Sequence, residues 1–373
     1  MILPKKPQIL YAPMLATFGG GSARGFGRGV GGAPGIPLTS AITFDNGNAM
    51  GNGPTGPQAS DLSYATRSDL TSLNFSVDST GIQSFDVPAI GSYSYQIAGA
   101  SSVRQIYGSS GPQYGLSYGK GAYFTGTFTI TAAEQGKKFF IACGNLPANA
   151  GGYSTSYAGQ QASSGDCFNG GGGGTFVGIG TTLSSCSPFL VAGGGGSQRT
   201  NYSYVQSELN AKADFSANGN NGGGATNDGQ PNIGGINGYG GYAFNQQDSG
   251  TAGAGFYGNA DVESGFASGG RIGTYYYSAS AQAFINGAKG CIAYNVGSNN
   301  PQPSGGFGGG GAGGWGGSGG GGGYSGGGSG TNSGTYGYGG GGSNFIDTTK
   351  ATSTGNPTAN RTGPGYFYVN YTG

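Results

Sequence analysis

Apolar and polar residues alternate with a period of two in several short stretches after about residue 40, a pattern typical of strands with one buried face. These alternating stretches predict strands at 75–77, 82–87, 93–97, 123–130 and 366–371. Residues 138–143 and 189–192 predict two more strands, with a turn around 134–136. A final strand at 366–371 would tie the domain together by pairing with an early one. Helical periodicity is weak, and 204–214 is the only helix candidate.

Composition decides whether these stretches can belong to a folded domain. The chain has 373 residues, of which 89 are Gly, and its 15 basic and 14 acidic residues are few. Such a bias usually indicates low-complexity disorder. However, 25 Tyr and 20 Phe can build a core, and disordered chains are depleted in aromatic residues. No charge run or Pro-rich hinge divides the chain, so we expect an extended arm at 1–40 and one mostly β domain at 41–373.

Glycine runs lie between the predicted strands, at 170–174, 193–196, 222–224, 305–328 and 339–342. In the longest run, Ala312, Trp315, Ser318 and Tyr324 are separated by three, three and six residues. A polyproline-II-type helix has three residues per turn, so these side chains would project from one edge and leave two edges of bare backbone. Such a helix has no internal hydrogen bonds, and its polar groups need partners on adjacent helices. The alternative is a Gly/Ser linker, but strands before and after the runs favour a scaffold that includes Trp315, Ser318 and Tyr324.

Several blocks of sequence are similar, in the same order, to the glycine-rich extracellular domain of the anaplastic lymphoma kinase and leukocyte tyrosine kinase receptors. The blocks are GPTGPQ at 53–58, GIQSFDVP at 81–88, YSYQIAGA at 93–100, GGGGGTFV at 170–177, PFLVAGGGG at 188–196, GGFGGGG at 305–311 and GGGGGYSGG at 319–327. The resemblance implies polyglycine-II helices bundled beside an antiparallel β-sandwich of tumour-necrosis-factor-like shape. The chain also resembles, more loosely, the distal tail-fibre adhesins of T-even-type phages. It has no kinase segment, and no cytokine-binding residue of the receptors falls in the matching blocks.

The residues that enzymes use most are scarce. The chain has no His, which removes the commonest general base and metal ligand. Cys143, Cys167, Cys186 and Cys291 are too widely spaced for a zinc ribbon or a redox pair; the first three could form a disulfide, or all could be buried thiols. The closest acidic pair, Asp261 and Glu263, is typical of solvated charge. We expect no enzyme activity, no metal and no cofactor.

The net charge and the lack of a long apolar stretch limit the classes of partner that we expect. The net charge of +1 gives no reason to expect nucleic-acid binding. No stretch approaches the roughly 20 apolar residues that span a bilayer, so we expect no membrane insertion.

The N-terminal arm is basic and apolar together. We interpret it as a peptide that docks on a partner, although a disordered tail is the alternative. The docking residues would be Lys5, Lys6, Ile9, Leu10, Tyr11, Met14 and Phe18.

Residues 228–280 are rich in Tyr, Ser, Gly and Asn, the residues that antibody paratopes favour. They suggest a recognition surface formed by Tyr239, Tyr242, Tyr257, Tyr275, Tyr276 and Tyr277. The alternative is that these tyrosines pack on glycine helices or on another subunit.

The chain has the chemistry of an extracellular protein, yet its first residues lack the apolar stretch of a secretory signal. A virion protein released by lysis satisfies both observations. We therefore expect a fibre, tail or capsid-surface protein of a bacteriophage that projects to recognise a host receptor. It would be held by other virion proteins through the arm and form a homo-oligomer. The alternatives are a purely structural decoration or joining protein, and a secreted ligand-binding module.

Overall fold

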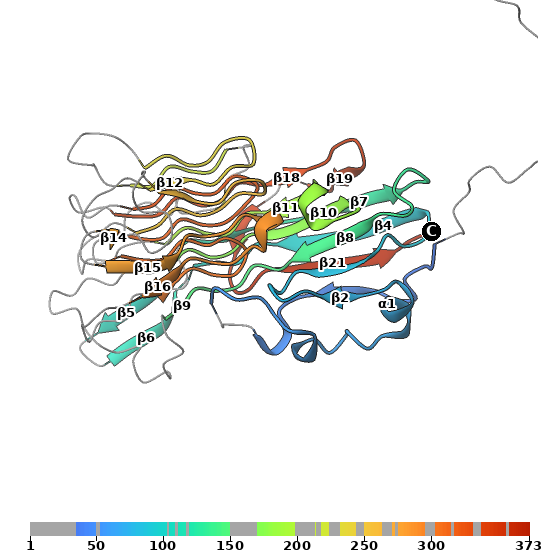
Figure 1. Cartoon of the computed structure of the whole chain (residues 1–373), viewed down its shortest axis with the longest axis horizontal. Coiled ribbons are helices and arrows are strands. Elements are labelled where there is room, and N and C mark those ends of the chain that lie inside the picture. The colour runs from blue at the N-terminus through green and yellow to red at the C-terminus, as the bar shows by residue number, and fades with distance from the viewer. Residues whose placement is uncertain are drawn as a thin grey trace, which may run out of the picture.

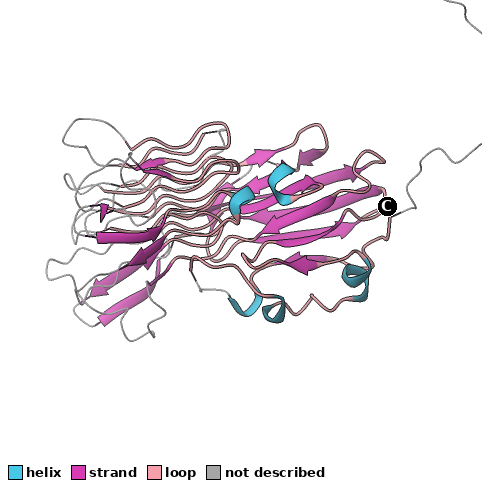
Figure 2. Cartoon of the chain, viewed as in Figure 1, coloured by secondary structure: helices cyan, strands magenta, loops and turns pink. Residues whose placement is uncertain are grey.

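A computed structural model gives the architecture of most of the chain (Figure 1). It describes residues 35–49, 53–102, 104–108, 111–116, 119–149, 170–197, 213, 218–223, 232–243, 250–262, 271–272, 275–294, 303–314, 317–330, 337–355 and 358–373. Strands dominate one half of the molecule, and wavy segments without regular strands run side by side through the other half (Figure 2). The docking residues of the predicted arm, Cys167, Trp315 and nearly all of 204–214 lie outside the described residues.

Two antiparallel six-stranded sheets form the strand-rich half, as predicted. Sheet A contains, in spatial order, β1 (Ile42–Phe44), β21 (Tyr366–Tyr371), β4 (Gly91–Ala98), β7 (Gly121–Ile130) and β19 (Ala351–Ser353), with β20 (Thr358–Arg361) also on β7. Sheet B contains β18 (Phe345–Ile346), β11 (Ser187–Ala192), β10 (Thr175–Gly180), β8 (Lys138–Ala142), β3 (Gln83–Asp86) and β2 (Ser76–Val77). The last strand, β21, pairs with both β1 and β4, which confirms the prediction that the final strand pairs with an early one.

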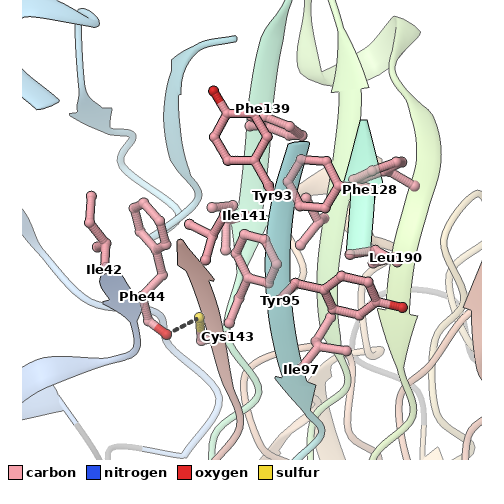
Figure 3. Close-up of a cluster of buried hydrophobic side chains, with 14 of the residues drawn as sticks. Ile42, Phe44, Tyr93, Tyr95, Ile97, Phe128, Phe139, Ile141, Cys143 and Leu190 are labelled. Atoms are coloured by element: carbon pink, nitrogen blue, oxygen red, sulfur yellow. Dashed lines mark hydrogen bonds between the residues drawn. The ribbon is translucent and has the colours of Figure 1, made fainter. Parts of the chain in front are cut away.

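An aromatic core fills the space between the two sheets (Figure 3). The ring of Phe128 on β7 stacks on Tyr93 at 5.1 Å, and its edge meets Phe189 on β11, also at 5.1 Å. Phe44 on β1 stacks on Phe85 on β3 at 5.2 Å. The contacts of Phe128 with Phe189 and of Phe44 with Phe85 cross from sheet A to sheet B, so the two sheets form a sandwich.

Sheet B is buried on both faces. Along β8, Phe139 points to the sandwich core, whereas Phe140 belongs to a second cluster on the opposite face. In that cluster Phe176 of β10 stacks on Phe284 at 5.1 Å, and Phe256 lies 4.9 Å from Phe284. Burial on both sides explains why β8, β10 and β11 have nearly continuous buried positions, while β4, β7 and β21 of sheet A alternate.

The remaining elements are short. Outside the two main sheets the pairs are β5 (Arg104–Gly108) with β6 (Gly111–Leu116), β9 (Ala148–Asn149) with β17 (Pro303–Ser304), β12 (Tyr242–Ala243) with β13 (Asp261–Val262), and β14 (Arg271–Ile272), β15 (Tyr275–Ala279) and β16 (Ile292–Tyr294) together. The described helices are α1 (Ser68–Ser72) and the single 3₁₀ turns η1 (Gly47–Ala49), η2 (Ala59–Asp61), η4 (Leu183–Ser185) and η5 (Phe284–Asn286). No helix of the described residues has the length and apolar character needed to cross a membrane.

The glycine lattice, as we call segments 170–174, 193–197, 250–256, 305–312, 317–330 and 337–344, is held by backbone hydrogen bonds. Successive N–H groups of residues 320–324 donate to different neighbours. From donor to carbonyl acceptor, these bonds are Gly320 to Thr251, Gly321 to Gly340, Gly322 to Gly172, Gly323 to Ala254 and Tyr324 to Ser343, at 2.9–3.3 Å. Every third residue therefore reaches the same neighbouring segment, and three consecutive residues reach three different segments.

The same repeat occurs on both sides of the segment 193–197. The N–H groups of Gly194 and Ser197 donate to Gly322 and Gly319, at 2.7 and 2.9 Å. Three residues apart again, the carbonyl groups of Gly194 and Ser197 accept from Gly342 and Gly339. A repeat of three is what polyglycine-II packing requires. The helical conformation of each segment stays a prediction.

The period of the longest glycine run suggested one straight helix, but in the structure the run folds back on itself. The Gly311 N–H donates to the Gly320 carbonyl at 2.8 Å, so 305–312 and 317–324 lie side by side. The Gly330 N–H then donates to Ser318 at 2.8 Å, which places 325–330 beside them as a third segment. Counting a period through this run was wrong because Gly reverses direction without a sequence signal. A straight helix of 24 residues would also extend about 74 Å at about 3.1 Å per residue.

The described thiols are buried. Cys143, Cys186 and Cys291 form no disulfide, so a bridge between Cys143 and Cys186 is excluded and the interpretation as buried thiols is confirmed for these three. The Cys143 Sγ donates to the Phe44 carbonyl at 3.2 Å inside the core (Figure 3).

Residues 35–40, at the end of the predicted arm, contact the sandwich. Leu38 is buried in the core, and the Ile36 carbonyl accepts from the Ala89 N–H at 3.2 Å. Asp69 of α1 accepts from both the N–H and the hydroxyl of Thr39 and is paired with Arg67 at 2.7 Å. The domain therefore includes these residues.

Candidate recognition surface

A tight turn at Ile236–Tyr239 displays apolar side chains next to the glycine lattice. The Tyr239 N–H donates to the Ile236 carbonyl at 3.0 Å, and the two central residues, Asn237 and Gly238, have φ of +52° and +87°. Positive φ at both central positions defines a type I′ turn, for which Asn-Gly is the favoured sequence. Three residues further out, the Tyr242 N–H donates to Ile233 at 2.8 Å, so the turn closes a hairpin-like excursion.

Hydrogen bonds from the lattice hold this turn in place. The Gly238 N–H donates to the buried Ser325 hydroxyl at 3.0 Å, and the Gly238 carbonyl accepts from Tyr257 at 2.8 Å. The Tyr239 carbonyl accepts from Gly326 at 3.0 Å. Because all three bonds involve the turn backbone, its side chains are carried on a rigid base.

The side chains on and beside the turn are unusually exposed for their type. Ile233, Ile236, Tyr239 and Tyr257 are 48%, 54%, 60% and 38% exposed, and we call these four residues the apolar ridge. Among the described residues, the other exposed large hydrophobic side chains are Ile36 and Ile90. Contiguous exposed apolar side chains mark interaction sites more often than scattered ones do.

Tyr257 joins the ridge to the second hydrophobic cluster. Its ring lies 4.9 Å from buried Phe256, and a side chain at Gly238 would collide with it. Nearby, Tyr324 packs on Phe345 of β18 at 4.6 Å. Burial, followed by the nearby Tyr324 phenol and Cys186 thiol, raises the pKa of Tyr257, so this phenol is neutral at physiological pH.

The predicted recognition tyrosines come from separate segments, and a common surface that includes Tyr275, Tyr276 and Tyr277 stays a prediction. Tyr239 and Tyr257 lie together on the ridge, and Tyr242 is half-buried at the start of β12. The residues Tyr275, Tyr276 and Tyr277 belong to β15, which Figure 1 shows toward the end of the molecule away from the C-terminus. A Cβ at Gly238 would meet both Tyr257 and Tyr324, and Tyr324 packs on Phe345 of β18, so this end of the ridge adjoins the sandwich.

The predicted scaffold residues have separate surroundings. Ser318 is fully buried between lattice segments, and Ala312 belongs to a cluster of small side chains with Ala252 and Ala254. Tyr324 packs beside the ridge rather than on a glycine helix edge. Ile233 and Ile236 were not predicted, although the Asn237-Gly238 pair is a hairpin signal that could have located them.

The described thiols are poorly suited to act as nucleophiles. Burial raises the pKa of the Cys143 thiol well above its ordinary value, that of Cys186 to about 12 and that of Cys291 to about 11. Such thiols are protonated and inert, because the thiolate is the nucleophile. In this part of the chain no group of three or more acidic or thiol side chains could hold a metal ion.

No protein-family model matches the chain, and no curated protein matches it either.

Proposed function

We propose that this chain is a structural surface protein of a virion, belonging to a fibre, tail or capsid, and that it recognises a host component through the apolar ridge. The observation that carries the proposal is the exposure of Ile236 and Tyr239 on a turn whose backbone is bound to the lattice. A preorganised turn loses little conformational entropy when it binds, and Tyr is enriched among the residues that dominate binding energy.

The same observation favours a lateral recognition surface over a distal tip. The ridge adjoins β18 and the second hydrophobic cluster, where half-buried Leu183 and Ile285 extend the apolar area. A receptor that covers this area would contact both the lattice and the sandwich. The glycine lattice then serves as a rigid support for the ridge.

A purely structural role is the second candidate, and a separate observation favours it. Ile36 and Ile90 are 41% and 50% exposed, and they are linked through the bond from Ala89 to Ile36. They adjoin the point where the predicted docking arm joins the domain. A neighbouring virion protein that binds the arm could cover them.

A competition assay separates the two roles. Purified chain added to host cells should reduce adsorption of the particle that carries it, and the double variant Ile236→Ser, Tyr239→Ser should compete at least about tenfold less well. Ile90→Ser is the matched control, because it removes an equally exposed isoleucine from another surface. Equal competition by the double variant, or none by the unchanged chain, would contradict host recognition through the ridge.

A further inference from the structure

The outer face of sheet A carries a group of tyrosines that the proposed function does not use. Tyr366 and Tyr368 of β21 and Tyr123 of β7 flank β4, because Tyr368 is opposite Gln96, and Ala98 is opposite both Tyr366 and Tyr123. All three rings are half-exposed. Both the Tyr123 and the Tyr366 hydroxyls approach the Gln96 side-chain oxygen, at 3.4 and 3.5 Å.

Arg361 lies over this group without an acidic partner. The guanidinium carbon is 5.3 Å from the centre of the Tyr366 ring, a cation–π arrangement. The Nε is buried and has no hydrogen-bond acceptor. A buried donor without an acceptor is costly, so its presence calls for an explanation.

Some described cations form ion pairs, and Arg361 does not. Three other described cations form ion pairs: Arg67 with Asp69, Lys138 with Asp86, and Lys350 with Asp347. Among the described residues Arg361 forms no ion pair and donates no hydrogen bond from its terminal nitrogens. Those nitrogens can therefore bind a carboxylate through two parallel hydrogen bonds.

Hydroxyl groups continue from the tyrosines along the same face. Thr125 and Thr354 share a hydroxyl contact at 2.9 Å, and Thr127 and Thr352 share another at 3.0 Å. None of the exposed large hydrophobic side chains lies on these strands. Aromatic rings, an amide and rows of hydroxyls suit a ligand with apolar C–H faces and many hydroxyls, and they do not suit an apolar protein surface.

We propose that the outer face of sheet A binds a saccharide that carries a carboxylate. The carboxylate accepts hydrogen bonds from the terminal nitrogens of Arg361. The sugar rings pack on Tyr368 and the adjacent tyrosines, and Gln96 bonds to their hydroxyls. This site is separate from the apolar ridge, so its test is independent of the test of the proposed recognition role.

Calorimetric titration of the full chain tests the site with two matched probes, trigalacturonic acid and its methyl ester, which have the same sugar rings but differ in that the ester carries uncharged, methylated carboxyl groups. The acid should bind, and the ester should bind about tenfold more weakly, since a charge-assisted pair is lost. Arg361→Gln should weaken acid binding by a similar factor, and Tyr368→Ser should weaken both probes. Lys137→Gln is the matched control. It removes a half-exposed cation from the turn between β7 and β8, away from the proposed site, and it should leave acid binding unchanged.

Three results would overturn this site: no binding of the acid, equal binding of acid and ester, or acid binding that Arg361→Gln leaves intact. Displacement of the acid by equimolar inorganic phosphate would reduce the site to a simple anion site and contradict saccharide recognition. Unchanged thermal unfolding of each variant confirms that a loss of binding is local.

Discussion

The sandwich and the glycine lattice bury their backbones in opposite ways. In the sandwich, each interior strand bonds to its neighbours on either side, and large aromatic side chains fill the space between the sheets. In the lattice, a segment such as 319–324 bonds to three or more neighbours, and almost nothing but backbone lies between them. The comparison shows that a glycine-rich segment can be as ordered as a strand when hydrogen bonds run in several directions.

The two regions should therefore respond differently to substitution. Sandwich stability depends on apolar side-chain volume, because core aromatics dominate the contacts there. Lattice stability depends on the absence of side chains, because a Cβ at most lattice glycines would meet a neighbouring carbonyl group. Glycine loses the most conformational entropy on folding, so these hydrogen bonds and contacts must offset a large cost.

Phe128→Ala should give the largest effect on the sandwich. The ring contacts Tyr93, Phe139 and Phe189 across both sheets, and its removal leaves a cavity. We expect the free energy of unfolding to fall by about 3–5 kcal/mol. Chemical denaturation measures it, with Phe128→Leu as a control that should lose clearly less. A loss under about 1 kcal/mol would mean that the core does not hold the sheets together.

Gly322→Ala should be the matching disruption of the lattice. Its Cβ would lie far inside van der Waals contact with the Gly308 carbonyl oxygen, which is backbone and cannot rotate away. We expect a loss of about 1–3 kcal/mol, in the range of overpacked cores.

Gly136→Ala is the control for the lattice substitution. A Cβ there would meet nothing within 4 Å, although φ is +79°, so only backbone strain of about 1 kcal/mol applies. Thermal unfolding of both variants compares them. A smaller loss at Gly322 than at Gly136 would contradict tight packing in the lattice.

The contacts of Asp69 with Arg67 and Thr39 predict that the stability of the sandwich depends on pH. Hydrogen bonding from Arg67 holds the pKa of Asp69 well below its usual value, against the opposing effect of burial. A lowered pKa in the folded state stabilises above the unfolded pKa of about 4, and that contribution is lost as the pH falls further. The stability difference between the unchanged chain and Asp69→Asn should therefore shrink below about pH 4. A difference that grows on acidification would contradict the sign of this shift.

Thr127→Val should have the smallest effect. Its hydroxyl bonds to Thr352 on the exposed face of sheet A, where water can replace the lost partner. We expect a change within about 0.5 kcal/mol, measured by chemical denaturation. A larger loss would show that the outer face contributes to stability as the core does.

Sequence patterns located the sandwich better than the lattice. The strands β4, β7 and β21 were predicted because one face of each is solvated, which makes apolar residues alternate. The strand β10 was missed because Gly178 and Gly180 resemble the end of a glycine run. The edge strands β19 and β20 were missed because Thr, Ser and Asn carry little strand signal.

The lattice exposed the limit of counting periods. A period of three was the correct repeat of its hydrogen bonds. However, the run at 305–328 folds into adjacent segments rather than one helix. Positive φ at Gly308 and Gly309 marks one such change of direction, and no residue type announces it in a run of glycines. Of the candidate site, Tyr239 and Tyr257 were found by composition. Their link to Tyr324 depends on contacts between distant segments, which sequence alone does not reveal.

Amide hydrogen exchange of residues 317–330, compared with β7 in the same sample, tests the central claim most directly. If the lattice is an ordered scaffold, the amides of 320–328 and 330 should be protected to an extent similar to that of the sandwich strand, because each of them donates a hydrogen bond, to a backbone carbonyl in every case except Ser325, which donates to the Ser343 hydroxyl. Exchange of 317–330 at the rate of an unfolded chain, while β7 stays protected, would contradict the account and return the glycine runs to the role of a flexible linker.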